Sequence, residues 1–160
     1  MSSNSKQRPW TGFLAGAIGG LAGSFVMSQL HYLLKPVESP AKQDGEDSTV
    51  KAASAVSQRV FHHHLTAREK KLAGPAVHYA FGCLVGAAYG VAAELDPRSR
   101  FACGMPFGAA VWLGAHAIGV PAAGLSKPIT KSSPRQEAIE FAAHLVYGAA
   151  VEGIRRLIRR

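Results

Sequence analysis

The sequence predicts an all-α membrane protein: a bundle of four transmembrane helices that forms one domain over residues 1–160. Two observations support this fold class. Charged residues are absent from 10–34, 72–93 and 101–126, and each stretch exceeds the roughly 20 residues that cross a bilayer. Sixteen of the 17 glycines lie in or beside the predicted helices. Because glycine weakens a helix in water but permits close helix packing in lipid, this distribution favours a membrane bundle.

The first predicted helix covers residues 11–34 and ends where Lys35 and Pro36 interrupt the apolar run. The second covers 72–95 and the third 101–125. Since a tight connection of only five residues joins them, these two helices are expected to be antiparallel neighbours.

The last part of the third helix contains Pro121, which should kink or end it because proline lacks the amide hydrogen that a helix needs. The fourth helix is predicted over 138–157. Its length suits a membrane crossing, but its charged side chains make it the most polar of the four.

The long loop between the first two helices contains an amphipathic pattern over 48–65. Apolar residues recur there at helical spacing after the capping residues Asp47 and Ser48, namely Val50, Ala53, Val56, Val60, Phe61 and Leu65. Such a pattern predicts a helix on the membrane surface or at the mouth of the bundle. The adjacent His62, His63 and His64 point in different directions on any helix and make a poor closed metal site.

Several function classes are excluded by composition. The formal net charge is +8, but four arginines stand at the end of the fourth helix, where they indicate a cytoplasmic anchor and not nucleic-acid binding. The cysteines Cys83 and Cys103 lie inside predicted spans and indicate no disulfide framework. No catalytic motif is present, so an enzyme is not expected. Four crossings then place both termini in the cytoplasm and the long loop outside.

Small residues form two stripes at four-residue spacing, which is a helix-packing signal in membranes. The first helix carries Gly12, Gly16 and Gly20, and the second carries Gly82, Gly86 and Gly90. The stripes predict packing within the chain or, alternatively, docking of a second copy or another membrane protein.

Ionisable residues inside membrane helices are costly and indicate function or a buried partner. At a rise of about 1.5 Å per residue, His78, His116 and His144 from three helices are expected at one depth in the outer half, with Glu140 one turn above His144. The set predicts a site for a proton, a metal ion or a small ligand. The three histidines are candidate ligands for zinc, copper, iron or haem, although the sequence names no cofactor. The alternative is a set of structural hydrogen bonds between helices.

Two further acidic residues stand near the cytoplasmic ends of their helices. Glu94 precedes Arg98 by four residues, and Glu152 precedes Arg156 by the same spacing. Residues four apart face each other on a helix, so two interfacial ion pairs are predicted.

Three motifs resemble a known family. They are HYAFGCLVGAAYGVAAELDP from His78, HAIGVPAAGL from His116 and EFAAHLVYGAAVEGIRR from Glu140, and together they are similar to the YagU-like family of uncharacterised bacterial inner-membrane proteins. The resemblance covers about the C-terminal half of the chain. It implies an inner-membrane location and a link with acid tolerance, and it supplies no reaction. The long loop departs from the family pattern, being shorter and without cysteine.

The predicted function is that of an integral inner-membrane protein whose outer-facing His/Glu site binds or relays a proton, metal ion or small ligand. The alternative is a structural or accessory subunit that docks a partner through its glycine faces. Both alternatives require the lipid bilayer as the surrounding medium. No nucleic-acid partner is expected.

Overall fold

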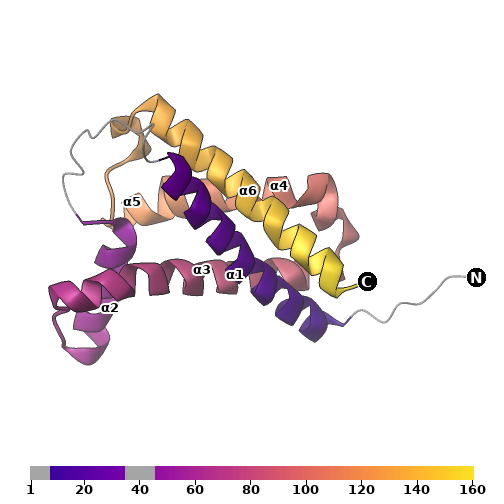
Figure 1. The fold of residues 1–160 in the computed structure, drawn as a ribbon, viewed down its shortest axis with the longest axis horizontal. Coiled ribbons are helices and arrows are strands. Elements are labelled where there is room, and N and C mark those ends of the chain that lie inside the picture. Colours follow the sequence, from indigo (N-terminus) through magenta and orange to yellow (C-terminus); the bar gives the residue numbers. More distant parts are fainter. Residues whose placement is uncertain (1–7, 35–45) are drawn as a thin grey trace, which may run out of the picture.

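The computed structural model describes residues 8–34 and 46–160, and its regular elements are all helical. Three long helices dominate the fold: α1 (Pro9–Leu34), α3 (Ala67–Leu95) and α6 (Pro134–Ile158). Helix α1 packs against α3 on one side and α6 on another, as Figure 1 shows in indigo, magenta and yellow. The polar tail at 1–7 and the start of the long loop at 35–45, including the predicted helix stop at Lys35 and Pro36, lie outside the described residues.

The predicted all-helical class is confirmed. Three stretches are long and apolar enough to cross a membrane, namely Pro9–Leu34, Ala67–Leu95 and Ala102–Ala122. They coincide with the first three predicted spans. Helix α6 has a comparable length of 25 residues but carries more charge than these three.

Helices α1 and α3 make their closest contact through the two predicted glycine stripes. A Cβ atom added to Gly16 would lie 2.8 Å from Gly90 Cα, and one added to Gly86 would lie 2.7 Å from Gly20 Cα. Gly12 meets Gly90 in the same way, and Gly20 meets Gly82. All six glycines contact the facing helix of the same chain. The stripes therefore form an intramolecular contact between antiparallel helices.

A second glycine face on α1 went unrecognised in the sequence. Gly19 lies against Val151 and Gly23 lies against Tyr147, both on α6, where added Cβ atoms would come within 2.8 Å of their neighbours. Two glycine faces on one helix allow α1 to approach α3 and α6 together. This arrangement explains why glycines recur every three or four residues along α1.

The distribution of side chains around α1 is the reverse of that in a helix of a water-soluble protein. Its five glycines and Ala15 are buried, whereas the large side chains of Leu14, Ile18, Leu21 and Phe25 are exposed. In lipid, large apolar groups contact acyl chains and small residues let helices approach each other. The pattern is therefore typical of a membrane helix that packs on its neighbours through small residues and exposes large apolar side chains on its outer side.

Helix α3 begins at Ala67, five residues before the predicted start at 72. Thr66 caps it: its hydroxyl accepts a hydrogen bond from the Glu69 amide, and the Glu69 carboxylate accepts one from the Thr66 amide at 2.7 Å. The prediction began the helix at Leu72, where the uncharged run starts. The charged first turn of α3 lies outside the apolar span. The Thr66 cap satisfies its backbone amides, so the helix can begin before the hydrocarbon region does.

The third apolar segment is broken into pieces and is not the continuous helix predicted over 101–125. A 3₁₀ helix, η2 (Pro97–Gly104), leads into α4 (Met105–Val111), a π-helical stretch, η3 (Trp112–Gly119), and the short α5 (Val120–Ala122). The Val120 amide donates to Ala115 O, five residues back. The wider turn immediately precedes Pro121, which has no amide hydrogen to donate to residue 117.

The partner of the third apolar segment is α6. Gly108 packs against the His144 carbonyl, and a Cβ on Gly148 would lie 2.9 Å from Gly108 Cα. Gly104, at φ +81, makes the sharp entry into α4. The predicted close neighbour relation of the second and third spans is thus wrong over most of their length, because glycine contacts pair α3 with α1 and α4 with α6.

Helix α2 (Ser48–Phe61) packs on the first turns of α3, with Val50 against Gly74. It ends four residues before the predicted limit of 65 because His62 adopts a left-handed conformation at φ 52. The side chains of Val56, Val60 and Phe61 remain exposed. Helix α6 extends the predicted 138–157 at both ends, since Ser133 caps it by accepting from the Gln136 amide, and a short 3₁₀ turn, η4 (Ile129–Lys131), precedes it.

The glycine contacts yield a stability prediction. Gly86→Ala should lower the free energy of unfolding in detergent by about 1–3 kcal/mol, because its methyl group meets backbone atoms of α1 that cannot rotate away. The matched control is Gly153→Ala, at a position with open space around it. Thermal unfolding followed by circular dichroism measures both variants, and equal loss in the two would contradict the packing described.

Candidate functional site

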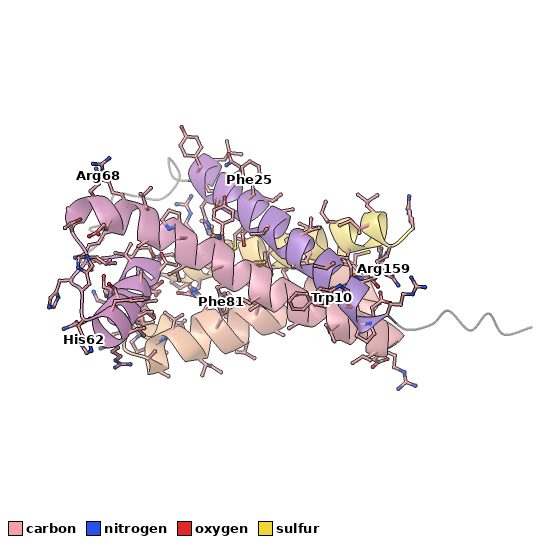
Figure 2. The ribbon with its side chains drawn as sticks, turned by 90° about the horizontal axis from the view of Figure 1, so that it is seen from below. Trp10, Phe25, His62, Arg68, Phe81 and Arg159 are labelled. Atoms are coloured by element: carbon pink, nitrogen blue, oxygen red, sulfur yellow. The ribbon has the colours of Figure 1, made fainter. Side chains whose placement is uncertain are left out.

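Polar side chains gather at two opposite ends of the helices. One group, called here the His/Glu cluster, consists of His31, His116, Glu137, Glu140 and His144. The other, called the Arg/Glu cluster, consists of Glu94, Glu152, Arg155, Arg156 and Arg159. Figure 2 shows Arg159 near Trp10 at one end of the molecule, and His62 and Arg68 at the other.

The His/Glu cluster begins where α1 ends. His31, in the last turn of α1, places its Nε2 3.3 Å from Glu140 Oε1 on α6. Glu140 also interacts electrostatically with His116 and His144. The carboxylate thus contacts His31 directly and lies within electrostatic range of two further imidazole rings.

The second half of the cluster links α6 to the π-helical stretch. His116 Nε2 lies 3.1 Å from Glu137 Oε2, and the His116 and His144 ring centroids are 5.7 Å apart. His144, which is buried, donates from Nδ1 to Glu140 O at 2.7 Å. That hydrogen bond places the proton of the neutral His144 ring on Nδ1, so Nε2 carries the lone pair that accepts a proton.

The π-helical stretch orients His116. The Trp112 ring stacks on His116 at 6.2 Å and meets Phe141 of α6 edge-on at 5.1 Å. In an α-helix, residues 112 and 116 lie about one turn apart. The π-helical stretch has more residues per turn, so it rotates the Trp112 and His116 side chains relative to each other about the helix axis. Single π turns recur at functional sites.

Of the three histidines predicted to converge, His116 and His144 come together and His78 does not join them. The His78 ring donates to Ser24 O on α1 at 3.4 Å and meets Tyr79 edge-on. It therefore ties α3 to α1. Among residues 8–34 and 46–160, no three His, Cys, Asp or Glu side chains are grouped so as to hold a metal ion.

Two members of the cluster were missed as site residues. His31, in the last turn of α1, was not among the predicted site residues, and Glu137 lies before the predicted start of the fourth helix. Glu137 and Glu140 are three residues apart and so share a helix face. Recognising Ser133 as the helix cap would have placed Glu137 in the first turn of α6, facing the same side.

An apolar layer separates the two clusters. Buried Met27, Ala93, Ala143, Tyr147 and Val151 fill it, and the Tyr147 hydroxyl donates to Gly82 O at 2.6 Å. His144 and Glu152 are eight residues apart on α6, about 12 Å along the axis. The layer therefore divides the interior into two polar ends.

The Arg/Glu cluster closes the other end of the molecule. Arg155 is 4 % exposed in its side chain and donates from Nε and Nη2 to the two oxygens of Glu152, at 2.6 and 3.0 Å. Arg156 also donates to Glu152, at 2.6 Å, and the Tyr89 hydroxyl donates to it at 3.0 Å. The buried Glu152 thus has partners from both α6 and α3.

The predicted pairing of Glu152 with Arg156 is present, but Glu94 has other partners than Arg98. Arg155 approaches Glu94 at 3.3 Å, and Arg159 forms two contacts with it at 3.0 and 2.9 Å. Helix α3 ends at Leu95 and Asp96 is extended. Arg98 therefore lies outside the helical turn that would have brought it to Glu94.

The buried arginine gives a second prediction. Arg155→Gln should lower the free energy of unfolding by about 3–5 kcal/mol, because two buried carboxylates lose a shared cation. Arg98→Gln, at an exposed residue of η2, should change it by less than about 0.5 kcal/mol. Thermal unfolding in one detergent measures both variants. A larger loss of stability in Arg98→Gln than in Arg155→Gln would contradict these contacts and favour the predicted pairing of Glu94 with Arg98.

Comparison with known proteins places these features in a family. Residues 38–153 match the family described as "Protein of unknown function (DUF1440)". The matched region includes α2, α3, the third apolar segment and all but the last five residues of α6. It contains every cluster member except His31, Arg155, Arg156 and Arg159. Neither the curated proteins nor the solved structures provide a match. The match agrees with the predicted membership of an uncharacterised family, although it does not identify that family as YagU-like. The chain belongs to the DUF1440 family.

Proposed function

We propose that the chain is an integral membrane protein in which α6 is a fourth crossing and the His/Glu cluster binds protons from one side of the membrane. The observation that carries the proposal is the pair of His–carboxylate contacts, His31–Glu140 and His116–Glu137, joined through the His116–His144 contact. Three separate helical segments contribute to this chain of ionisable groups.

The pairing of its charges supports α6 as a membrane helix. Glu152 and Arg155 neutralise each other in the interior, and Glu140 and Glu137 face histidines. Ionisable groups in a bilayer face partners inside the bundle in this way. At about 1.5 Å per residue, the 25 residues of α6 extend roughly 37 Å, enough to cross the hydrocarbon.

The arginines orient the proposed topology. Arg155, Arg156, Arg159 and Arg160 stand at the end of α6, and basic residues flanking a span favour the cytoplasmic side. Four crossings then put both termini in the cytoplasm and the His/Glu cluster toward the outside. The family resemblance makes the bacterial inner membrane the proposed location.

Histidine suits proton binding because its charge changes between about pH 5 and 8. Protonation of His31 or His116 creates a cation 3.1 to 3.3 Å from a carboxylate and strengthens the link between segments. Because the His116 and His144 rings are 5.7 Å apart, the charge of one affects proton binding by the other. The acid tolerance implied by the family resemblance would require a response of this kind.

The apolar layer favours binding and release over conduction. The layer of Tyr147, Val151 and their neighbours separates the His/Glu cluster from the Arg/Glu cluster by about 12 Å. A proton that enters the His/Glu cluster would leave by the same side. We propose no catalytic role, since the acids and bases of the cluster are one another's partners.

Trp112 provides a reporter for proton binding, because it stacks on His116. In a Trp10→Phe background, Trp112 emission should change reversibly on acidification as a cation forms beside the indole. His116→Gln should remove that change. Glu137→Gln should alter the pH at which it occurs.

The matched control is Glu69→Gln, because Glu69 makes a similar 3.2 Å contact with the exposed His63 at a distant position. It should leave Trp112 emission unchanged. An emission that is independent of pH, or one that responds equally without His116, would argue against proton binding at this site.

The topology can be checked separately. A green fluorescent protein joined after Arg160 should fluoresce in intact bacteria, because that reporter folds on the cytoplasmic side, and an alkaline phosphatase at the same point should be inactive. An active phosphatase would place the C-terminus outside and reverse the orientation of the His/Glu cluster.

A further inference from the structure

An open apolar groove of about 500 Å³ runs along α3 on the side that faces α4. It is lined by Phe81, Leu84, Val85, Ala88 and Ala92 from α3 and by Phe107 from α4. In Figure 2, α3 and the third apolar segment draw together toward the Trp10 end and lie apart toward the His62 end, and Phe81 is labelled on α3 between them.

The groove follows from the choice of packing partners. Glycine contacts draw α3 to α1 and α4 to α6, so α3 and α4 diverge after the connection that joins them. Tyr89 stacks on Phe107 at 4.3 Å and forms the floor where the two helices meet. The groove is therefore a fixed consequence of the fold.

One end of the groove adjoins a basic surface. Tyr89, in its wall, donates to Glu152, which also accepts from Arg156. Residues 94–100 and 152–160 together contain six arginines and three carboxylates. Arg98 and Arg160 are exposed, and the Arg156 side chain is 47 % exposed.

The groove extends about 16 Å along α3 from Phe81 to Ala92, at a rise of about 1.5 Å per residue. Its lining is almost entirely apolar, and the exposed arginines follow the end of α3 just beyond Ala92. An apolar wall with positive charge beyond one end matches a molecule that has a hydrocarbon chain and an anionic head.

We propose that the groove holds one acyl chain of an anionic phospholipid, whose phosphate lies on the arginines at the end of α3 and α6. The apolar lining selects the chain, and the positive end selects the headgroup charge. This lipid site is independent of the proton-binding function, since it lies at the other end of the molecule.

Native mass spectrometry tests the proposal. Protein from mild detergent is mixed with equal amounts of phosphatidylglycerol and phosphatidylcholine, and the lipids retained on the intact chain are counted. We expect one retained phosphatidylglycerol in preference to phosphatidylcholine. Arg98→Gln together with Arg160→Gln should reduce that preference by about fivefold for each arginine, whereas Arg68→Gln with Arg135→Gln, at exposed positions of the opposite end, should not.

Filling the groove gives an independent readout. Ala88→Trp should reduce retention of both lipids, and Ala142→Trp, at an exposed position of α6 that does not line the groove, should not. Circular dichroism confirms that each variant is folded. Equal retention in all variants would overturn the proposal, as would a dimer that Ala88→Trp dissociates, because the groove would then hold a second copy of the chain.

Discussion

The close approach of α1 to two helices at once is the constraint on which the structure depends. Hydrophobic exclusion gives no net attraction between apolar helices in lipid, so contact must come from packing and polar links. Glycine supplies the packing: one face of α1 lies on the backbone of α3 and another on the backbone of α6. The same device joins α4 to α6 through Gly104, Gly108 and Gly148. A methyl group at these positions would meet backbone atoms and separate the helices.

Both polar clusters lie where these glycine contacts bring helix ends together. Antiparallel packing of α1 on α6 sets His31 beside Glu140, and the α4–α6 contact sets η3 beside the His144 turn. At the opposite end, the approach of α3 to α6 lets Arg155 join Glu94 to Glu152. Charged groups in a bilayer need such partners, so the packing and the polar pairing support each other.

The two ends differ in chemistry. Arginine stays charged at any physiological pH, so the Arg/Glu cluster is a permanent electrostatic link. Histidine is the side chain whose charge commonly changes in that range, so the His/Glu cluster is the end at which we propose proton binding. The apolar layer between them isolates one from the other. The helix pairing also leaves the apolar groove beside α3, which has Tyr89 and Phe107 in its lining and the arginines beyond its end at Ala92.

The sequence by itself determined the helical class, the three apolar spans and the glycine stripes, because span length and four-residue spacing are local properties of a helix. It also singled out His116, His144 and Glu140 as candidates, since buried ionisable residues are conspicuous in apolar runs. Only the tertiary structure decided that His78 binds Ser24 O while His31 and Glu137 complete the cluster. Depth along a helix can be counted from sequence, but rotation about its axis and the choice of neighbour cannot. The choice of neighbour also explains why Glu94 pairs with Arg155 and Arg159 and not with Arg98. Helix α3 ends at Leu95, so Arg98 is no longer one helical turn from Glu94, and the packing of α6 supplies the arginines.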